Sequence, residues 1–196
     1  MDEAQELRRQ ILLKRDSLGP ELRSDLSSKA CTRLVSTDFF KQAGTILLYI
    51  SFRSEVETLD LVDEAISTGK RIFAPVTLIG ERRLEIYQLT SRTELVPGAY
   101  GIAEPDRDRC PKGDPASLDL VIVPGSVFSL SCGRYGYGGG FYDRFLSTQA
   151  PQAVRAGLAF DFQVLDSIPL APHDELMDYI VTDRRTITCS RKERKR

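Results

Sequence analysis

Apolar residues recur at helical spacing along the first part of the chain. Leu7, Ile11 and Leu12 lie among charged residues, which predicts an amphipathic helix over the first ~15 residues. Gly19-Pro20 ends this segment, and the proline suits the first turn of a second helix. That helix is predicted from a stripe with a period of about 3.6 residues, formed by Leu22, Leu26, Ala30 and Leu34.

Short apolar runs further along the chain predict strands, and two of these runs are too apolar to alternate. The segment TILLYIS, which begins at Thr45, and LDLVIV at 118–123 suit strands that are buried on both faces. Other strands are predicted at 71–74, where Pro75 closes the strand, and at 84–89, 154–159 and 179–182. Residues 91–117 are rich in Pro, Gly and Asp and predict a loop.

Helical signals fall between these strands. Thr58 is predicted to cap a helix that ends at Gly69 and has one apolar face, formed by Leu59, Val62, Ala65 and Ile66. Another helix is predicted at 141–146. Strands that alternate with helices predict an α/β fold with a largely parallel sheet covered on both faces. The length predicts a single domain over residues 1–196.

Composition and charge exclude several classes of protein. The 196 residues carry a formal net charge of -1, and this balance argues against a globally disordered chain. No run of about 18 apolar residues is present, so we expect no membrane-spanning helix. The first residues are charged throughout, unlike a secretory signal. We therefore expect a cytoplasmic protein with no membrane partner.

The end of the chain is strongly basic. Residues 184–196 hold seven basic side chains and one acidic side chain, a net charge of +6. Such a tail can contact nucleic acid. This one has no interleaved aromatic residues, so a solvated terminus is the favoured interpretation, and we expect no nucleic-acid partner.

The chain has four cysteines and one histidine, namely Cys31, Cys110, Cys132, Cys189 and His173. No two cysteines form a CxxC pair, which argues against a tetrahedral zinc site. We expect reduced thiols, as is usual in a cytosolic protein. A catalytic cysteine–histidine pair is an open alternative that no local pattern supports.

The segment GRYGYGGGFYD at 133–143 is the strongest candidate for chemistry. Five glycines fall within residues 133–140, after a buried strand and before a helix. Backbone N–H groups without side chains can turn toward an anion, and the start of a helix adds partial positive charge. The segment is neither a Walker A loop nor a dinucleotide fingerprint. It predicts a phosphate site, in which Gly138 needs a positive φ, and a flexible surface turn is the alternative.

Asp143 directly follows these glycines, and a carboxylate close to phosphate groups calls for a bridging cation. Mg²⁺ held by few carboxylates and several waters meets this need, whereas the alternative is an acid favoured by the dipole of the first helical turn. Asp174 is a candidate second carboxylate by position alone. Arg8, near the same helix face as Arg15, is either solvated or reaches a phosphate.

The segment SFRSEVET at 51–58 leaves the carboxyl end of a predicted buried strand, where ligands bind in open parallel sheets. Phe52 could stack on a flat ring, and Glu57 could accept hydrogen bonds from ring N–H groups. The alternative is a core aromatic residue and an acid in a capping turn.

These segments, in this order and spacing, resemble the 5-formyltetrahydrofolate cyclo-ligase family, also called the methenyltetrahydrofolate synthetases, from about Leu7 to Thr182. The motifs that carry the resemblance are Leu7-Arg8 through Lys14-Arg15-Asp16, SFRSEVET at 51–58, Ala74-Pro75, GIAEP at 101–105, LDLVIVPG at 118–125, GRYGYGGGFYDRFL at 133–146, Pro172-His173-Asp174 and Ile180-Val181-Thr182.

The resemblance implies a three-layer α/β/α sandwich and a ligase that depends on ATP and Mg²⁺. In this family ATP phosphorylates the formyl oxygen of 5-formyltetrahydrofolate, N10 attacks the activated carbon, and 5,10-methenyltetrahydrofolate forms with ADP and phosphate. Phosphoryl transfer relies on positioning and charge neutralisation, so no Ser–His–Asp pattern is needed. The implied partners are these small molecules, and we expect a monomer.

The resemblance also implies roles for individual residues. Arg134 and Tyr142 are expected to be catalytic, and Asp143 and Asp174 to hold the metal. The expected folate contacts are Phe52, Glu57, Tyr137, Gly138, Gly139, Gly140 and Phe141. The expected ATP contacts are Arg8, Arg134, Tyr135, Gly136, Tyr137, Gly138, Gly139, Gly140, Phe141 and Tyr142.

Three positions depart from the family pattern. Ala4 stands where the family has the lysine of a Lys-x-x-x-Arg pair, Val76 replaces a frequent basic residue, and Gly139 stands where many members have lysine. Arg9 and Lys14 are candidates to compensate for the missing charge. The alternative function is that of a catalytically weak homologue that binds a folate or a nucleotide.

Overall fold

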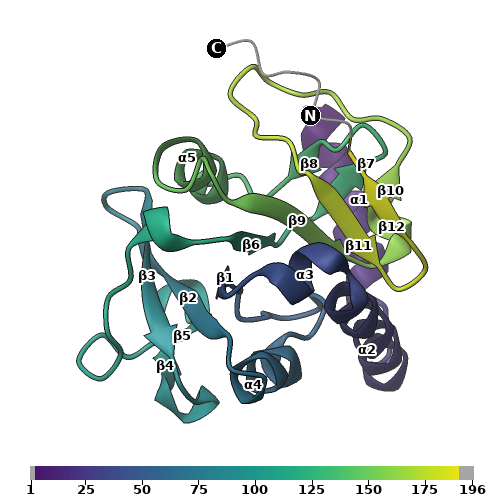
Figure 1. Ribbon diagram of the computed structural model, residues 1–196. Coiled ribbons are helices and arrows are strands. Elements are labelled where there is room, and N and C mark those ends of the chain that lie inside the picture. Colours follow the sequence, from purple (N-terminus) through teal and green to yellow (C-terminus); the bar gives the residue numbers. More distant parts are fainter. Residues whose placement is uncertain (1–2, 190–196) are drawn as a thin grey trace.

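The computed structural model describes residues 3–189 and has a seven-stranded sheet at its centre (Figure 1). The five inner strands pair in parallel, and each edge strand pairs antiparallel with its neighbour. In sheet order the strands are β12 (Thr186–Thr188), β11 (Tyr179–Thr182), β9 (Val154–Ala159), β6 (Leu120–Val123), β1 (Thr45–Leu47), β2 (Arg71–Leu78) and β3 (Arg83–Leu89).

Helices cover both faces of this sheet. α2 (Pro20–Ser36), α3 (Asp38–Gln42) and α4 (Leu59–Ser67) lie below the sheet in Figure 1, and α5 (Phe141–Thr148) lies above it. The buried residues form two hydrophobic clusters, one for each face of the sheet. Leu34 of α2 and Leu61 of α4 belong to the same cluster as Ile46 of β1, and Phe145 of α5 belongs to the same cluster as Leu47 of β1. Neighbouring residues of one strand thus face opposite layers, as the pleat requires. The three-layer α/β/α sandwich with a largely parallel sheet is confirmed.

α1 (Glu3–Asp16) packs on a second, smaller sheet. This sheet has the order β10-β7-β8, with β7 at Val127–Ser129, β8 at Arg134–Tyr135 and β10 at Val164–Leu165. Leu7 and Ile11 of the helix lie against a small cluster of buried residues that includes Val127 and Tyr135. The predicted apolar face of the first helix is confirmed, and it attaches α1 to β8, the strand that leads into residues 136–140, which we call the glycine segment.

Two predictions about the region after β1 are wrong. Pro75 does not close β2, which runs on to Leu78 while pairing with β3. The β1 pairing ends at Phe73, so β2 has one neighbour beyond it, and a residue without an N–H is tolerated there. Residues 91–117 are also more than a loop, because they contain the antiparallel strands β4 (Leu95–Pro97) and β5 (Ala103–Pro105).

α4 begins and ends where the sequence predicts, but the side chain of Thr58 does not cap it. Gly69, with φ of 82°, lies just beyond the helix, as the predicted glycine stop requires. Thr58 occupies the N-cap position, but its hydroxyl donates to the carbonyl of Tyr49 and accepts from the N–H of Ser51. The threonine therefore fixes the segment after β1 instead of capping the helix.

The expectation of four reduced thiols is wrong, because Cys132 and Cys189 form a disulfide. Their Cα atoms are 5.9 Å apart, although 57 residues separate them in the sequence. The N–H of Met177 donates to the Cys132 carbonyl, and the N–H of Cys189 donates to the Asp178 carbonyl. Backbone hydrogen bonds thus bring the two segments together. Cys31 and Cys110 are free.

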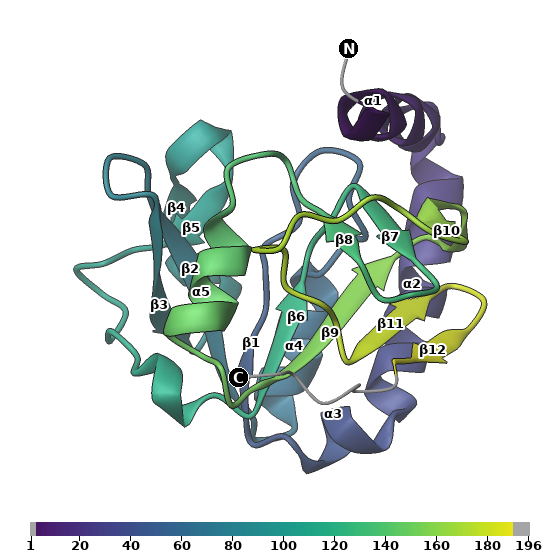
Figure 2. The ribbon, with the colours of Figure 1, turned by 90° about the horizontal axis from the view of Figure 1, so that it is seen from above.

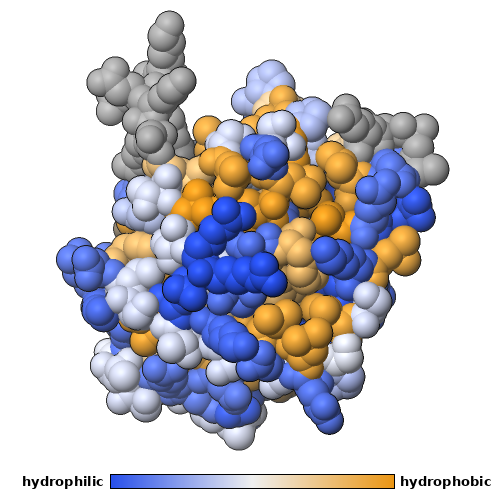
Figure 3. Space-filling model, turned by 90° about the vertical axis from the view of Figure 1, so that its right-hand side faces the viewer, coloured by the Kyte–Doolittle hydropathy of each residue, from blue (hydrophilic) through white to orange (hydrophobic). Residues whose placement is uncertain are grey.

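The basic end of the chain, residues 184–196, was expected to be a solvated terminus, and this prediction is wrong for its first residues. β12 pairs with β11, and Arg185 forms an ion pair with Asp161. Figure 3, which shows the face that carries α2 and β12, has strongly hydrophilic residues across its middle. Short edge strands flanked by charge resist pairing with other chains. The rest of the basic tail, 190–196, lies outside the described residues. None of the described helices is both long and apolar enough to cross a membrane.

We predict that the Cys132–Cys189 disulfide stabilises the fold. A cross-link across 57 residues restricts the unfolded chain and contributes about 2–4 kcal/mol. For the double variant Cys132→Ser/Cys189→Ser, thermal melting should occur about 5–15 °C lower than for the wild type. Cys31→Ser is the control and should change little. A wild-type melting temperature that does not respond to reductant would contradict the prediction.

Candidate functional site

A cavity of about 910 Å³ opens beyond the carboxyl ends of β1 and β6. Its walls come from α1, the segment after β1, the β2–β3 hairpin, the turn before β5, the glycine segment and residues 173–174. Figure 2 shows α1 at one side, the β4–β5 pair at the other, and the segment between β8 and α5 between them. This is where ligands bind in open parallel sheets, and the volume suits a small-molecule site.

The glycine segment forms one wall of this cavity. Gly138 has φ of 94° and Gly140 has φ of 64°, so the predicted positive φ at Gly138 is confirmed. Gly140 is the N-cap of α5, and no side chain caps the first turn of that helix. The backbone N–H groups of that turn are therefore available to a ligand.

Arg134 and Asp143 form a buried ion pair across the ends of the glycine segment. The guanidinium Nη2 lies 2.9 Å from both carboxylate oxygens of Asp143, and the Arg134 side chain is 2% exposed. Asp143 also accepts a hydrogen bond from the N–H of Glu175. The neighbouring Asp174 lines the same cavity, and its carboxylate accepts from the N–H of Ala171. The fold therefore brings both predicted metal ligands to one cavity.

Two buried polar atoms in this wall lack hydrogen-bond partners within the described part of the chain. They are Nε of Arg134 and the hydroxyl of Tyr142, and both residues line the cavity. Burial raises the pKa of the Tyr142 hydroxyl well above its ordinary value, so this group keeps its proton. Unpartnered buried polar groups are costly, and both of these groups are donors that a bound ligand can satisfy.

α1 holds the glycine segment from the opposite side. Nε of Arg8 donates to the Gly136 carbonyl at 3.1 Å, and the guanidinium lies 4.7 Å from the centre of the Tyr135 ring. Arg15 is 3% exposed and donates to the Tyr137 hydroxyl at 2.9 Å. Neither arginine is simply solvated, and both line the cavity.

Phe52 lies in the cavity wall, but Glu57 does not. The Glu57 carboxylate forms an ion pair with Arg23 at 2.9 Å instead. The acid that reaches the cavity is Glu55, which accepts from the Tyr137 hydroxyl at 2.6 Å and from the Phe52 N–H at 2.9 Å. Burial raises the pKa of Glu55, although both hydrogen bonds act in the opposite direction. Sequence reasoning missed this residue because two acids share the segment.

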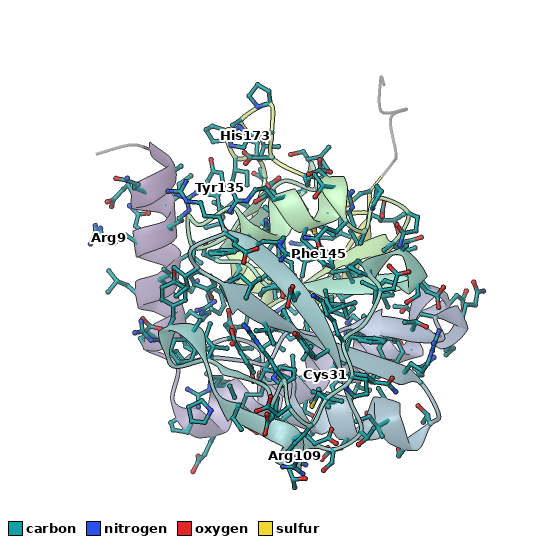
Figure 4. The ribbon with its side chains drawn as sticks, turned by 90° about the vertical axis from the view of Figure 1, so that its left-hand side faces the viewer. Arg9, Cys31, Arg109, Tyr135, Phe145 and His173 are labelled. Carbon is teal, nitrogen blue, oxygen red and sulfur yellow. A yellow bond between two sulfur atoms is a disulfide. The ribbon has the colours of Figure 1, made fainter. Side chains whose placement is uncertain are left out.

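No thiol takes part in this site as far as the structure describes the chain. Figure 4 shows His173 at the top of the molecule and Cys31 in its lower half, far from each other in this view. Burial raises the pKa of the Cys31 thiol to about 12, so it is not an activated nucleophile. Cys110 also has a raised pKa and is buried away from the cavity lining. The cysteine–histidine alternative is therefore discarded.

The model of the 5-formyltetrahydrofolate cyclo-ligase family matches residues 1–183. The chain belongs to this family. The members it resembles are named as cyclo-ligases, so the chain is a ligase.

Similar proteins cover nearly the whole chain. The probable 5-formyltetrahydrofolate cyclo-ligase of Schizosaccharomyces pombe is 30% identical in an alignment of 200 positions, which covers 89% of this chain and 98% of the relative. The Escherichia coli cyclo-ligase is 30% identical over 174 residues, covering 88% and 96%. The solved structure of the Aquifex aeolicus 5,10-methenyltetrahydrofolate synthetase has a TM-score of 0.84 and 31% identity, covering 95% and 93%.

The departures from the cyclo-ligase pattern can now be placed. Ala4 packs against the apolar cluster under α1, and Val76 is buried in the core. Arg9 pairs with Glu6 and points away from the body of the protein in Figure 4. Lys14 lies over the ring of Phe162, outside the cavity wall. Neither of the two suggested residues replaces the missing charge.

Two other arginines bring positive charge close to the glycine segment. Arg82, at the tip of the β2–β3 hairpin, and Arg144, on α5, both line the cavity. Arg144 donates from Nε to the Arg82 carbonyl at 2.8 Å and from Nη2 to the Gly139 carbonyl at 2.6 Å. Sequence reasoning missed both residues, because the contact joins segments 62 positions apart.

We predict that Glu55→Gln changes how stability depends on pH. A glutamate with a raised pKa in the folded state stabilises the protein at low pH and loses this contribution as pH rises through the raised value. Glutamine carries no charge, its carbonyl oxygen can accept from the Phe52 N–H, and its amide N–H can donate to the Tyr137 hydroxyl oxygen. The melting temperature of Glu55→Gln, relative to wild type, should therefore rise as the pH increases above about 4.3, the ordinary pKa of a glutamate.

Thermal melts across this pH range test the prediction, with Glu57→Gln as the matched control. Glu57 lies in the same segment, but its carboxylate is in a partly exposed ion pair. The relative melting temperature of the control should not rise with pH. A flat or falling difference for Glu55→Gln would contradict the prediction, because it would show that the folded state does not disfavour the carboxylate.

Proposed function

We propose that this enzyme converts 5-formyltetrahydrofolate to 5,10-methenyltetrahydrofolate, using ATP and Mg²⁺ and releasing ADP and phosphate. Membership of the cyclo-ligase family supports the substrate and the reaction class. The observation that carries the proposal is that one cavity joins the uncapped start of α5 to the pair formed by Glu55 and Tyr137. One end suits phosphate groups, and the other suits a polar ring system. The proposed enzyme is monomeric.

The residues at the glycine segment fit ATP and its metal ion. Arg134 and Tyr142 each have a buried donor without a partner, and the N–H groups at the start of α5 add further donors. Asp143 and Asp174 are two carboxylates at the same cavity, and the described residues offer no group of three metal ligands. Mg²⁺ in nucleotide sites needs only one or two protein carboxylates beside the phosphates. When bound, the ion neutralises charge on the transferring phosphoryl group.

The opposite wall of the cavity fits the pterin ring of the folate. Glu55 lines it and can accept hydrogen bonds from ring N–H groups. Tyr137 is held by Arg15 and Glu55 in a chain of hydrogen bonds, so its orientation is fixed before the substrate arrives. Phe52, on the same segment as Glu55, offers an aromatic face to the benzoyl ring of the folate.

The proposed chemical step replaces a poor leaving group with a good one. The formyl oxygen attacks the γ-phosphorus of ATP, and the bond to ADP breaks. N10 then attacks the activated carbon and loses its proton, and the former formyl oxygen leaves with the phosphate. Arg134 stabilises charge on the transferred group, and the protonated Tyr142 hydroxyl donates a hydrogen bond to it. The glycine segment also promotes the reaction by holding the phosphate groups in position for the transfer.

A catalytically weak homologue that binds a folate or a nucleotide is the second candidate. The observation that favours it is Ala4, whose methyl group packs on the apolar cluster under α1 where the family resemblance expects a lysine. Turnover separates the two candidates. The proposed enzyme forms 5,10-methenyltetrahydrofolate, seen as a new absorbance band, only when ATP and Mg²⁺ are both present. Tight binding of both ligands without this band would support the weak homologue.

We predict that Asp174→Asn increases the Mg²⁺ concentration needed for half-maximal rate by at least about tenfold, which corresponds to about 1.4 kcal/mol. The hydrogen bond from the Ala171 N–H can persist to the amide oxygen, so melting should change little. Titration of the rate with Mg²⁺ measures the effect, and an unchanged requirement would remove Asp174 from the metal site.

The companion variant Asp143→Asn should raise the Mg²⁺ requirement and also destabilise the protein. It leaves the buried guanidinium of Arg134 without its counter-charge, a change that costs about 3–5 kcal/mol in buried pairs. Rate and melting temperature should therefore fall together, unlike in Asp174→Asn. An unaltered melting temperature would show that the ion pair does not stabilise the fold.

We predict that Gly138→Val weakens ATP binding and removes most turnover. A valine at φ of 94° is strained by about 1–3 kcal/mol, and its side chain would occupy the phosphate-facing surface. The matched control is Gly69→Val, at φ of 82° and also with open space around an added Cβ, but outside the cavity. Both variants should melt at similarly reduced temperatures, and only Gly138→Val should lose ATP affinity in calorimetric titration. Equal ATP affinity in both would refute the phosphate site.

A further inference from the structure

Arg53 presents a positive charge to the cavity without a carboxylate partner among the described residues. Its side chain is exposed and lines the cavity wall, and its guanidinium lies 5.0 Å from the centre of the Phe52 ring. The nearest acid in its own segment, Glu55, is already bonded to the Tyr137 hydroxyl and the Phe52 N–H. Arg53 is therefore a cation that a ligand anion can reach.

The backbone at this wall is held in an unusual conformation. Arg53 has φ of 55° and Tyr100 has φ of 58°, values that residues other than glycine rarely adopt. The two residues come from different loops that meet at Phe52, since a Cβ added to Gly101 would lie 3.9 Å from its ring. Strained residues persist where the surrounding structure imposes them, and they gather at ligand sites. Tyr100 is 62% exposed and also lines the cavity.

The other cavity arginines are committed to the glycine segment. Arg8 donates to the Gly136 carbonyl, Arg15 to the Tyr137 hydroxyl, and Arg144 to the Gly139 carbonyl. Arg82 lies beside Arg144, which donates to its carbonyl. Arg8, Arg82 and Arg144 thus lie at the wall that suits phosphate groups, whereas Arg15 holds Tyr137 at the wall that suits the pterin ring. Arg53, with Phe52 and Tyr100, forms a separate cationic and aromatic wall.

We infer that Arg53 binds a carboxylate of the substrate's glutamate, with Phe52 and Tyr100 beside the benzoyl ring; this rests on the proposed function. A folate has its reacting formyl group at one end and two carboxylates at the other, joined by an aromatic ring. Carboxylates and phosphates repel each other, so the glutamate belongs at the wall away from the glycine segment. A guanidinium beside aromatic faces matches a benzoylglutamate in both charge and shape.

The test compares 5-formyltetrahydrofolate with its α,γ-diamide, which keeps N10 and the formyl group but lacks both negative charges. For the wild type, KM should be about fivefold higher for the diamide, the effect of an exposed charge pair of about 1 kcal/mol. In Arg53→Gln the two KM values should become equal because KM for the diacid rises, while kcat stays unchanged. Arg53→Lys, which keeps the charge, should restore part of the preference.

Two controls separate this role from others. Arg82→Gln removes another cavity cation with a positive φ, and it should preserve the ratio of the two KM values. Arg109→Gln removes an exposed arginine outside the cavity, and it should match the wild type with both substrates. A wild type without preference for the diacid, or an Arg53→Gln that raises both KM values equally, would overturn the inference.

Failure of the proposed function can be told apart from failure of this inference, because it would be seen as an absence of turnover. If no turnover occurs with either substrate, the dissociation constants of the diacid and the diamide are measured by calorimetry with the same variants. A preference for the diacid that Arg53→Gln abolishes would support the carboxylate site even in a protein without turnover. Equal affinities in wild type would reject it.

Discussion

The buried ion pair between Arg134 and Asp143 determines how the cavity is built. A guanidinium that is 2% exposed needs a counter-charge, and Asp143 supplies it from the first turn of α5. The pair fixes the two ends of the glycine segment, because Arg134 lies on β8 before it and Asp143 lies just after it. Asp143 also accepts from the Glu175 N–H, which holds the segment that carries Asp174. One interaction therefore positions three segments of the site.

α1 provides the second constraint, and it acts over a long distance in sequence. Arg8 and Arg15 reach the glycine segment across 128 and 122 positions, while the apolar face of the helix packs on the small sheet. A glycine-rich segment by itself has high conformational entropy. Contacts from a rigid helix on one side and from Arg144 on the other restrict it, so the cavity can exist before a ligand binds.

Periodicity in the sequence predicted the elements that are long enough to show it. The inner strands and the helices α1, α2 and α4 bury one face or both, so their apolar positions repeat. β8 and β10 have two residues each, too few for any period, and their pairing depends on tertiary contacts. The choice between Glu55 and Glu57 depends on the turn at Arg53, where φ is positive without a glycine to signal it. The Cys132–Cys189 pair joins distant segments that no spacing relates.

The family pattern predicted the location of the site better than it predicted which residues supply the positive charge there. Phosphate groups respond to the summed field of nearby cations, which different positions can supply. This chain has Ala4 in an apolar contact, yet Arg82 and Arg144 line the same cavity from the β2–β3 hairpin and α5. A guanidinium in the first turns of a helix lies at the positive end of its dipole. A bound anion removes that repulsion, so the placement of Arg144 is consistent with a site shaped to hold phosphate.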